Sequence, residues 1–341
     1  MYINIKYFGQ IAEVTQTKEE NLEFSGIIVS ELVETLYLKY SNLRTKNFQI
    51  AQNQELVSME TELTGNDIAL LPPFAGGWLI MSRYNRHIIL SEIGQAGQDK
   101  ISNAKVLVIG AGGLGCPILQ YLTAAGVGSI GIVDFDSVNI SNLQRQVLFG
   151  TSTLGKNKAE AAKQRLEDLN DEISIVAYPK KLTHCNAVDL FHKYDIIVDG
   201  TDNFETRYLV NDACIISNKP LVFGAIYKFE GQVSIFNYKN GPSYRCIFPH
   251  PPEKGSIPNC SEVGVLGVLP GIIGAMQANE VIKIILELGN MLSGKLLCFN
   301  ALTLQNSIIR ISRSEKTIQS VLKKKETFQK KKNRFYLWNW S

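Results

Sequence analysis

A glycine-rich turn between a short apolar strand and an apolar helix constrains the fold of this chain most strongly. The strand pattern covers Val106 to Ile109, Gly110-Ala-Gly-Gly-Leu-Gly115 follows, and a helix pattern runs from Leu114 to Ala125 before a second strand at Ile130 to Val133. Parallel strands joined by a crossover helix form a βαβ unit. Two further short apolar segments extend the pattern, at Asp195 to Asp199 and Pro220 to Phe223. The sequence therefore predicts an α/β fold with a doubly wound, Rossmann-like parallel sheet.

A separate small unit precedes this sheet. Residues 3 to 7 alternate apolar with polar side chains at strand spacing, and a helix-period pattern runs from Val29 to Tyr40. The unit ends at Leu70-Leu-Pro-Pro-Phe-Ala-Gly-Gly77, where two prolines stop strand pairing and two glycines leave the backbone unhindered. A flexible interdomain linker would explain the glycines but neither the prolines nor the domain before them. We therefore expect two different domains with a boundary near Gly77.

Composition and the apolar pattern narrow the class of protein. The 341 residues are 45% hydrophobic and 20% charged, which is enough to bury a core and excludes global disorder. The longest apolar stretch, around Val265 to Met276, is interrupted by glycine and proline and falls short of the roughly 18 residues of a membrane helix. The six cysteines form no Cys-x-x-Cys pair, and the first ten residues lack the pattern of an export signal. We expect a cytoplasmic protein without a membrane span.

The last residues of the chain are basic. Residues 313 to 341 hold nine Lys or Arg and two Glu, although the net charge of the whole chain is only +3. Such a segment is compatible with contact to nucleic acid, but a solvated terminus explains the charge without a partner. We interpret the tail in this second way and expect no nucleic-acid partner.

The glycine turn fits the phosphate-binding fingerprint GxGxxG, because it follows a strand and opens a helix whose N–H groups can receive phosphates. Asp134 lies 24 residues after Gly110, at the end of the next strand, where a carboxylate can accept ribose hydroxyl groups. These features fit a nicotinamide-dependent dehydrogenase as well as other proteins that bind adenosine nucleotides. A purely structural glycine turn is a third interpretation.

A second phosphate-loop pattern is incomplete. Gly150 to Lys156 satisfies GxxxxGK, but Asn157 stands where Ser or Thr would hold magnesium. The helix that follows, starting near Lys156, would place Lys158 as a cation near phosphates. On spacing alone, an exposed lysine is the simpler interpretation of Lys158.

Polar residues cluster after the strands on either side of the glycine turn. They are Asp134 and Asp136, the segment Asn142-Leu-Gln-Arg145, Lys158, and Thr201-Asp-Asn203. Together they supply a ribose acceptor, phosphate-binding cations and a carboxylate for a hydrated magnesium ion, which a dehydrogenase would not need. Taken singly, Asp202 is typical of a helix N-cap and Arg145 of a surface ion pair.

Three further motifs accompany the cluster: Arg83-Tyr-Asn-Arg86-His-Ile-Ile-Leu90, Ser141-Asn-Leu-Gln-Arg-Gln146 and Glu230-Gly-Gln232. With the glycine turn, they resemble the E1-like adenylyltransferases that activate sulfur-carrier proteins, specifically molybdopterin synthase adenylyltransferases. The resemblance implies a homodimer in which Arg86 reaches the ATP of the partner protomer, and a magnesium ion held by Asp202. It also implies ATP-binding roles for Gly113, Asp134, Asn142, Arg145, Lys158, Asp202 and Asn203.

The first 77 residues resemble the sulfur carrier itself, the small subunit of molybdopterin synthase, which has a ubiquitin-like β-grasp fold. The match rests on Tyr7-Phe-Gly-Gln10, Leu56-Val-Ser58 and the ending Pro72-Pro-Phe-Ala-Gly-Gly77. The thiamine-pathway carrier also ends in Gly-Gly, but the double proline favours the molybdopterin branch. We expect a carrier domain at 1–77, a junction at 78–82, an E1-like adenylyltransferase domain at 83–310 and a basic tail at 311–341.

Cysteine usage departs from the family. Its members usually hold zinc with two Cys-x-x-Cys pairs, whereas Ser243-Tyr-Arg-Cys246 retains one cysteine and the second pair is missing. We therefore expect no zinc. Cys260 resembles a loop cysteine that joins covalently to the carrier in some relatives, and we weigh that catalytic role equally against burial in the core. No sulfurtransferase domain is recognised, so a separate cysteine desulfurase or sulfurtransferase would supply sulfur.

The combined motifs predict ATP-dependent adenylation of the C-terminal glycine of a sulfur carrier, Gly77 after Gly76 here, in molybdenum cofactor biosynthesis. The carrier would be a free protein or the released 1–77 domain. The alternatives are a thiamine-pathway adenylyltransferase, an NAD-dependent dehydrogenase, and an inactive carrier or scaffold. The sequence leaves open whether the chain is cleaved after Gly77 or the enzyme is translated from Met81.

Overall fold

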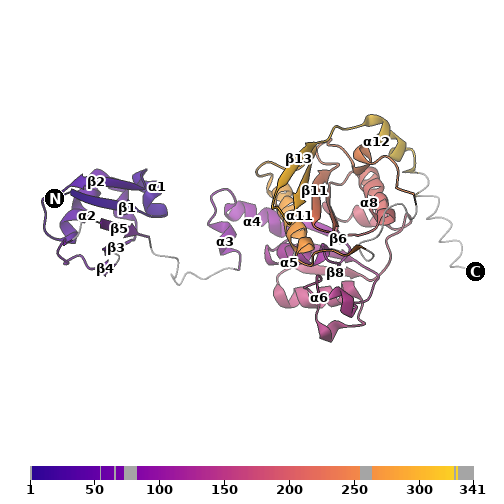
Figure 1. Ribbon diagram of the computed structural model, residues 1–341, viewed down its shortest axis with the longest axis horizontal. Coiled ribbons are helices and arrows are strands. Elements are labelled where there is room, and N and C mark those ends of the chain that lie inside the picture. Colours follow the sequence, from indigo (N-terminus) through magenta and orange to yellow (C-terminus); the bar gives the residue numbers. More distant parts are fainter. Residues whose placement is uncertain are drawn as a thin grey trace, which may run out of the picture. The chain divides into compact units, whose positions relative to one another are not determined.

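The computed structural model describes residues 2–53, 55–64, 67–72, 83–253, 263–325 and 328. The chain divides into two compact units, Met1–Met81 and Ser82–Ser341, drawn in Figure 1. Each unit has its own hydrophobic core. The two units are therefore described separately.

The N-terminal unit is a five-stranded sheet with the order β2-β1-β5-β3-β4. Its strands are β1 (Tyr2–Tyr7), β2 (Glu19–Glu23), β3 (Gln49–Gln52), β4 (Glu55–Val57) and β5 (Asp67–Leu71), and its helices are α1 (Gln10–Thr15) and α2 (Val29–Lys39), followed by the 3-10 turn η1 (Ser41–Thr45). β1 pairs parallel with β5 and antiparallel with β2. The apolar face of α2 packs with inward-facing residues of β1 and β5 in one core. The predicted β-grasp fold is confirmed.

The second unit is built on an eight-stranded sheet with the order β13-β12-β11-β10-β9-β6-β7-β8. Its strands are β6 (Lys105–Ile109), β7 (Ser129–Val133), β8 (Ser174–Tyr178), β9 (Ile196–Asp199), β10 (Leu221–Tyr227), β11 (Glu230–Phe236), β12 (Lys295–Asn300) and β13 (Asn306–Arg310). The strands from β8 through β7, β6 and β9 to β10 are parallel, and β11, β12 and β13 extend the sheet antiparallel. The predicted Rossmann-like sheet is confirmed, and the antiparallel extension adds to it.

Helices cover both faces of this sheet (Figure 1). They are α3 (Asn85–Ile88), α4 (Gly94–Asn103), α5 (Gly115–Ala124), α6 (Lys158–Leu169), α7 (Ala187–Phe191), α8 (Phe204–Ser217), α9 (Tyr244–Ile247), α11 (Leu269–Leu286) and α12 (Glu315–Leu322), with 3-10 turns η2 (Ile140–Asn142) and η3 (Thr151–Thr153). Val106 and Val108 of β6 face the core with α4, α5, α6 and α11, whereas Leu107 and Ile109 face the core with α7, α8 and α12. The chain runs from β6 to β7 and β8 on one side and then crosses back to β9 on the other side of β6. This reversal of strand order creates a crevice at the carboxyl ends of β6, β7 and β9.

Helix α11 corrects one expectation from the sequence. Pro270, Gly271 and Gly274 do not interrupt the helix, because Leu269–Leu286 is continuous with Pro270 in its first turn, whereas Gly267 precedes it. There the missing N–H has no helical partner to lose. Among the described residues, α11 is the helix whose length and composition would suit a membrane span. It is 56% buried, it packs against α5 and β10, and we interpret it as a core helix.

Candidate nucleotide-binding site

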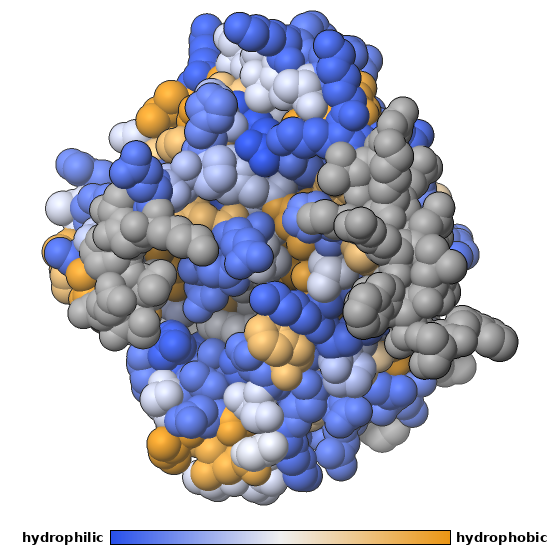
Figure 2. Space-filling view, turned by 90° about the vertical axis from the view of Figure 1, so that its right-hand side faces the viewer, coloured by the Kyte–Doolittle hydropathy of each residue, from blue (hydrophilic) through white to orange (hydrophobic). Residues whose placement is uncertain are grey.

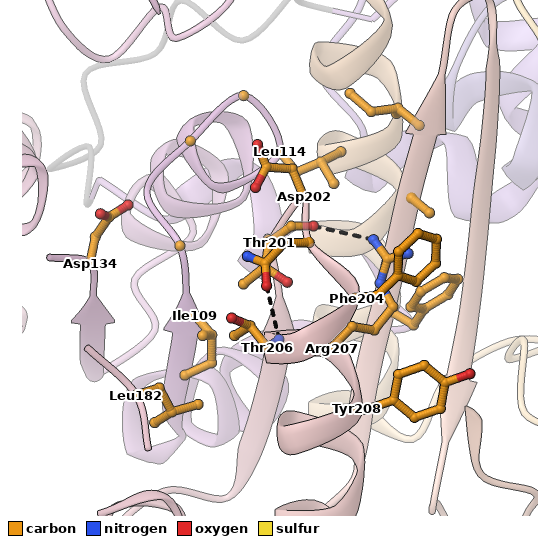
Figure 3. A pocket seen from close by; sticks show the side chains of 18 of the residues that line it. Ile109, Leu114, Asp134, Leu182, Thr201, Asp202, Phe204, Thr206, Arg207 and Tyr208 are labelled. Atoms are coloured by element: carbon orange, nitrogen blue, oxygen red, sulfur yellow. Dashed lines mark hydrogen bonds between the residues drawn. The ribbon is translucent and has the colours of Figure 1, made fainter. Parts of the chain in front are cut away.

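A cavity of about 790 Å³ opens at the carboxyl ends of β6, β7, β9 and β10. Among the residues proposed from the sequence, Gly113, Asp134, Arg145, Lys158, Asp202 and Asn203 line it. Figure 3 shows Asp134 on one side of the glycine turn and Thr201 with Asp202 on the other. The face of the molecule in Figure 2 is mostly hydrophilic, with apolar side chains in its middle and in further groups near its edges. The second unit thus brings six of the proposed residues to one cavity.

The glycine turn is fixed by close backbone approach. Gly110 has φ 92°, in the left-handed region, and a Cβ atom there would lie 2.9 Å from the carbonyl oxygen of Gly200. At Gly115 a Cβ atom would collide with the carbonyl oxygen of Gly110. The turn therefore needs these glycines for structure, and it also directs the N-terminus of α5 to the cavity. The structural and phosphate-binding interpretations are compatible.

Asp134 connects the end of β7 to the glycine turn. Its Oδ2 accepts a hydrogen bond from the Ala111 amide at 2.8 Å, and its Oδ1 accepts one from the Asp136 amide at 2.9 Å. Burial raises the pKa of this carboxyl group, although the hydrogen bonds from the two backbone amides act to lower it. Each carboxylate oxygen has a second lone pair, so Asp134 retains acceptors for ribose hydroxyl groups.

Lys158 is buried rather than exposed, contrary to the simpler interpretation of its spacing. Only 7% of the residue is accessible, and its Nζ lies 3.4 Å from Oδ2 of Asp136. Asn157 caps α6, because its side chain accepts a hydrogen bond from the Glu160 amide at 3.2 Å. Lys156 is exposed and does not line the cavity. The GxxxxGK segment thus forms no phosphate loop in this cavity, and only Lys158 reaches it.

Arg145 and Asn142 differ in their relation to the cavity. Arg145 lines it, and its guanidinium donates to the carbonyl oxygen of Ser141 at 3.1 Å. Among the described residues Arg145 forms no salt bridge, so the surface ion pair considered from the sequence is not found. Asn142 lies outside the cavity lining, because its Oδ1 accepts the Asn139 amide at 3.1 Å in a local turn. The structure does not bring Asn142 to the nucleotide site.

Asp202 and Asn203 have separate tasks. Asn203 caps α8, since its Oδ1 accepts a hydrogen bond from the Thr206 amide at 2.9 Å. Asp202 is exposed to the cavity, and within the described ranges its side chain has no hydrogen bond or ion pair. The N-cap considered for Asp202 therefore belongs to its neighbour. A free carboxylate beside a phosphate site fits magnesium, which proteins usually hold through one or two carboxylates plus substrate phosphates.

Arg86 lies on α3, away from the cavity of its own chain. Its neighbours are fixed to the unit: Arg83 bonds to the Leu169 carbonyl at 2.9 Å, Asn170 donates to the Tyr84 hydroxyl at 2.9 Å, and His87 Nδ1 lies 3.1 Å from Oε1 of Gln98. Arg86 is exposed and has no partner among the described residues. The motif thus anchors Arg83, Tyr84 and His87 and leaves the Arg86 guanidinium exposed.

Cys246, the one cysteine retained in the segment where the resemblance places a zinc-binding pair, lies in a hydrogen-bonded corner. Its sulfur accepts hydrogen bonds from the amides of Ser243 and Ser314, each at 3.3 Å. These serines are the N-cap residues of α9 and α12. In the ranges that the structure describes, no three His, Cys, Asp or Glu side chains gather as a metal site. The absence of zinc stays a prediction.

We predict that the purified protein contains substoichiometric zinc and that a chelator leaves its melting temperature unchanged, because hydrogen bonds close this corner. Elemental analysis and thermal unfolding with and without chelator measure both quantities. A full equivalent of tightly bound zinc per chain would contradict the prediction.

Some residues proposed from the sequence lie outside the described ranges. They are Gly76, Gly77, the junction 78–82 and Cys260. The structure therefore does not address the carrier terminus or the proposed covalent role of Cys260. The site proposals for them remain expectations from the sequence.

Sequence reasoning missed several residues that line the cavity. Lys180 and Lys181 follow β8, and Arg207 lies in the first turns of α8. No sequence pattern around Lys180 and Lys181 indicates this position, because only the order of strands in the sheet places the end of β8 beside that of β7. Arg207 carried no signal of its own either, because Glu205 and Asp212 are further charged residues of the same helix; it is only 8% exposed.

The fold and the cavity define a nucleotide-binding protein with a doubly wound sheet preceded by a β-grasp domain. Comparison with family models places residues 84–320 in the ThiF family and residues 5–77 in the ThiS family. The chain belongs to the ThiF family and carries an N-terminal ThiS domain. The resemblance stated from the sequence is confirmed at this level.

Curated relatives agree. The sulfur carrier protein adenylyltransferase of Thermus thermophilus is 50% identical over 227 residues, which are 65% of this chain and 84% of the relative. The adenylyltransferase and sulfurtransferase MOCS3 of Culex quinquefasciatus is 46% identical, with 76% of this chain and 58% of the relative covered. The corresponding protein of Sus scrofa is 49% identical, with 64% of this chain and 48% of the relative covered. The chain thus spans about half the length of these two longer relatives.

Solved structures give the same fold. Escherichia coli MccB with ATP is 27% identical, with a TM-score of 0.56, and covers 64% of this chain and 67% of MccB. MccB with MccA is 26% identical, with a TM-score of 0.60, and covers 68% of this chain and 72% of MccB. The fold of the second unit is therefore similar to that of MccB, a protein whose structure was solved with ATP.

Proposed function

We propose that this protein uses ATP to adenylate the C-terminal glycine of a sulfur-carrier protein. One observation supports this most: an unpaired carboxylate, Asp202, shares a cavity with a phosphate-binding turn and the cations Arg145 and Lys158. The ThiS domain of the same chain supplies the expected type of substrate. Relatives named adenylyltransferases of sulfur carriers point the same way.

In the proposed reaction, the carrier carboxylate attacks the α-phosphorus of ATP. A bond forms between a carboxylate oxygen and phosphorus, the bond to the bridging oxygen breaks, and pyrophosphate leaves with that electron pair. The carboxylate is already ionised at neutral pH, so no general base is needed. The protein has to orient two anions that repel each other and to offset their charge, which Lys158 and Arg145 would do.

Magnesium bound with ATP would neutralise phosphate charge and orient the phosphates. Asp202 is the residue that would hold it, and Asp134 would hold the ribose. The N–H groups at the start of α5 would receive phosphate oxygens. The roles of these residues are part of the proposal.

The sequence of the carrier domain supports a proposal for the biosynthetic pathway. The prolines before Gly76-Gly77 favour the molybdenum cofactor pathway over the thiamine pathway. A separate cysteine desulfurase or sulfurtransferase would convert the acyl-adenylate to a thiocarboxylate, in the cytoplasm. An NAD-dependent dehydrogenase is the rival enzyme, and calorimetric titration with ATP and with NAD distinguishes them: tight binding of NAD but not ATP would overturn our proposal.

Arg86 provides the test of a homodimeric site. If its guanidinium completes the site of the partner protomer, Arg86→Ala and Asp202→Ala homodimers should both be nearly inactive in ATP–pyrophosphate exchange with added carrier ending at Gly77. Subunits mixed and allowed to exchange should regain activity, because one of the two sites in each mixed dimer then holds both native residues. Mixtures that stay as inactive as the separate variants would contradict a shared site.

A further inference from the structure

A buried ion pair lies directly below the turn that carries Asp202. Asp199, the last residue of β9, is fully buried, and Arg207 of α8 is 8% exposed. Nε of Arg207 lies 3.5 Å from Oδ2 of Asp199, beyond a good hydrogen bond. Buried ion pairs are often no more stabilising than apolar residues of similar size. Stability alone therefore does not explain the Asp199–Arg207 pair.

This pair holds Thr201, the residue immediately before Asp202. Oδ1 of Asp199 accepts hydrogen bonds from the Thr201 amide at 2.9 Å and from its hydroxyl at 2.6 Å. The guanidinium of Arg207 donates to the Thr201 carbonyl oxygen at 3.3 Å, as Figure 3 shows. Both backbone groups of Thr201 are thus fixed from two elements, β9 and α8.

Further contacts fix the two charged residues themselves. Gln277 of α11 donates to the carbonyl oxygen of Asp199 at 2.8 Å. The guanidinium of Arg207 lies 5.6 Å from the ring centroid of Phe204, 5.1 Å from that of Phe223 and 6.0 Å from that of Tyr244. Such cation–π contacts confine the guanidinium within a low-dielectric site. In contrast, the Asp202 side chain has no hydrogen bond or ion pair among the described residues.

We propose that Asp199, Thr201 and Arg207 form a clamp that fixes the backbone of Asp202 and so sets the position of its carboxylate for magnesium-bound ATP. These are positioning residues. The inference rests on the proposed function, because it assumes that Asp202 holds the metal. Ligand-orienting partners of this type typically change metal affinity about tenfold to a hundredfold when they are removed.

The test is calorimetric titration of the full chain with the non-hydrolysable analogue AMPCPP, with and without magnesium. In the wild type, magnesium should tighten binding. In Arg207→Lys and in Thr201→Val, the magnesium gain, which is the ratio of the AMPCPP affinities measured with and without magnesium, should fall about tenfold relative to the wild type. In ATP–pyrophosphate exchange with added carrier ending at Gly77, the magnesium concentration for half-maximal rate should rise by a similar factor, whereas saturating magnesium should restore most of kcat.

The matched control is a second buried Arg–Asp pair that involves the same helix. Asp212 of α8 pairs with Arg245, and neither residue lines the cavity. Asp212→Asn should lower the melting temperature at least as much as Arg207→Lys but leave the magnesium gain as in the wild type. This comparison separates positioning from a general loss of stability.

Two outcomes would overturn the inference. A full magnesium gain in both Arg207→Lys and Thr201→Val, together with its loss in Asp202→Ala, would leave the proposed metal ligand standing and remove the clamp. A wild-type protein that binds AMPCPP equally with and without magnesium would instead contradict the metal role of Asp202, and the clamp would fail with it. If Arg207→Lys does not fold, Thr201→Val alone decides.

Discussion

With added carrier ending at Gly77, Asp202→Ala should lower the rate of ATP–pyrophosphate exchange about a hundredfold while the fold survives. The carboxylate is exposed to the cavity and has no partner among the described residues, so its loss removes no stabilising contact. Exchange assays and thermal unfolding on the same preparation measure both effects. Near-normal exchange would remove magnesium binding from the roles of Asp202.

Its neighbour supplies the control. Asn203 caps α8 through the Thr206 amide, so Asn203→Ala should cost about 1 kcal/mol in the free energy of unfolding. We expect the two neighbouring variants to give opposite patterns: a catalytic loss at Asp202 and a stability loss at Asn203. Equal losses of stability in both variants would show that Asp202 also supports the helix.

The second large effect concerns the peptide bond between Gly77 and Trp78. In the intact chain Gly77 has no free carboxylate, and the proposed chemistry needs one. A chain ending at Gly77, mixed with protein starting at Met81, should release pyrophosphate from ATP, whereas the uncleaved chain alone should release none above background. Equal release from both preparations would contradict the requirement for a free terminus.

Tethering strengthens this expectation. A short linker can hold a blocked tail near its partner at an effective concentration of about millimolar, which is enough to compete with a free carrier. Added carrier ending at Gly77 should therefore be adenylated more slowly by the uncleaved chain than by protein starting at Met81. Equal rates would show that the attached domain does not compete.

The sequence was most informative where local physics decides the structure. The apolar run at Val106 to Ile109 and the glycines after it predict a buried parallel strand and a tight turn, and the structure has both. Asp134 and Lys158 could be assigned to one site because the carboxyl ends of parallel strands meet at one edge of a sheet.

Other features depend on tertiary contacts that no local pattern encodes. Asp202 and Asn203 are both suitable N-cap residues, and only the backbone geometry shows that Asn203 takes that position. From the sequence, Gly274 was expected to interrupt the apolar stretch around Val265 to Met276. In the structure it lies within α11, where the missing side chain allows close approach to Leu114 and Pro117. The clamp residues Asp199, Thr201 and Arg207 are near one another in the sequence, but the contacts that confine them come from distant residues, namely Phe223, Tyr244 and Gln277.

The most direct test of the proposed activity is the intact mass of a chain comprising residues 1–77 after incubation with ATP, magnesium and protein starting at Met81. We predict that the mass of the 1–77 chain increases by one adenylyl group, and that omission of ATP or replacement of Asp202 by alanine abolishes the increase. An unchanged mass under the complete conditions would contradict the account, as would an adenylate formed at Gly77 of the uncleaved chain.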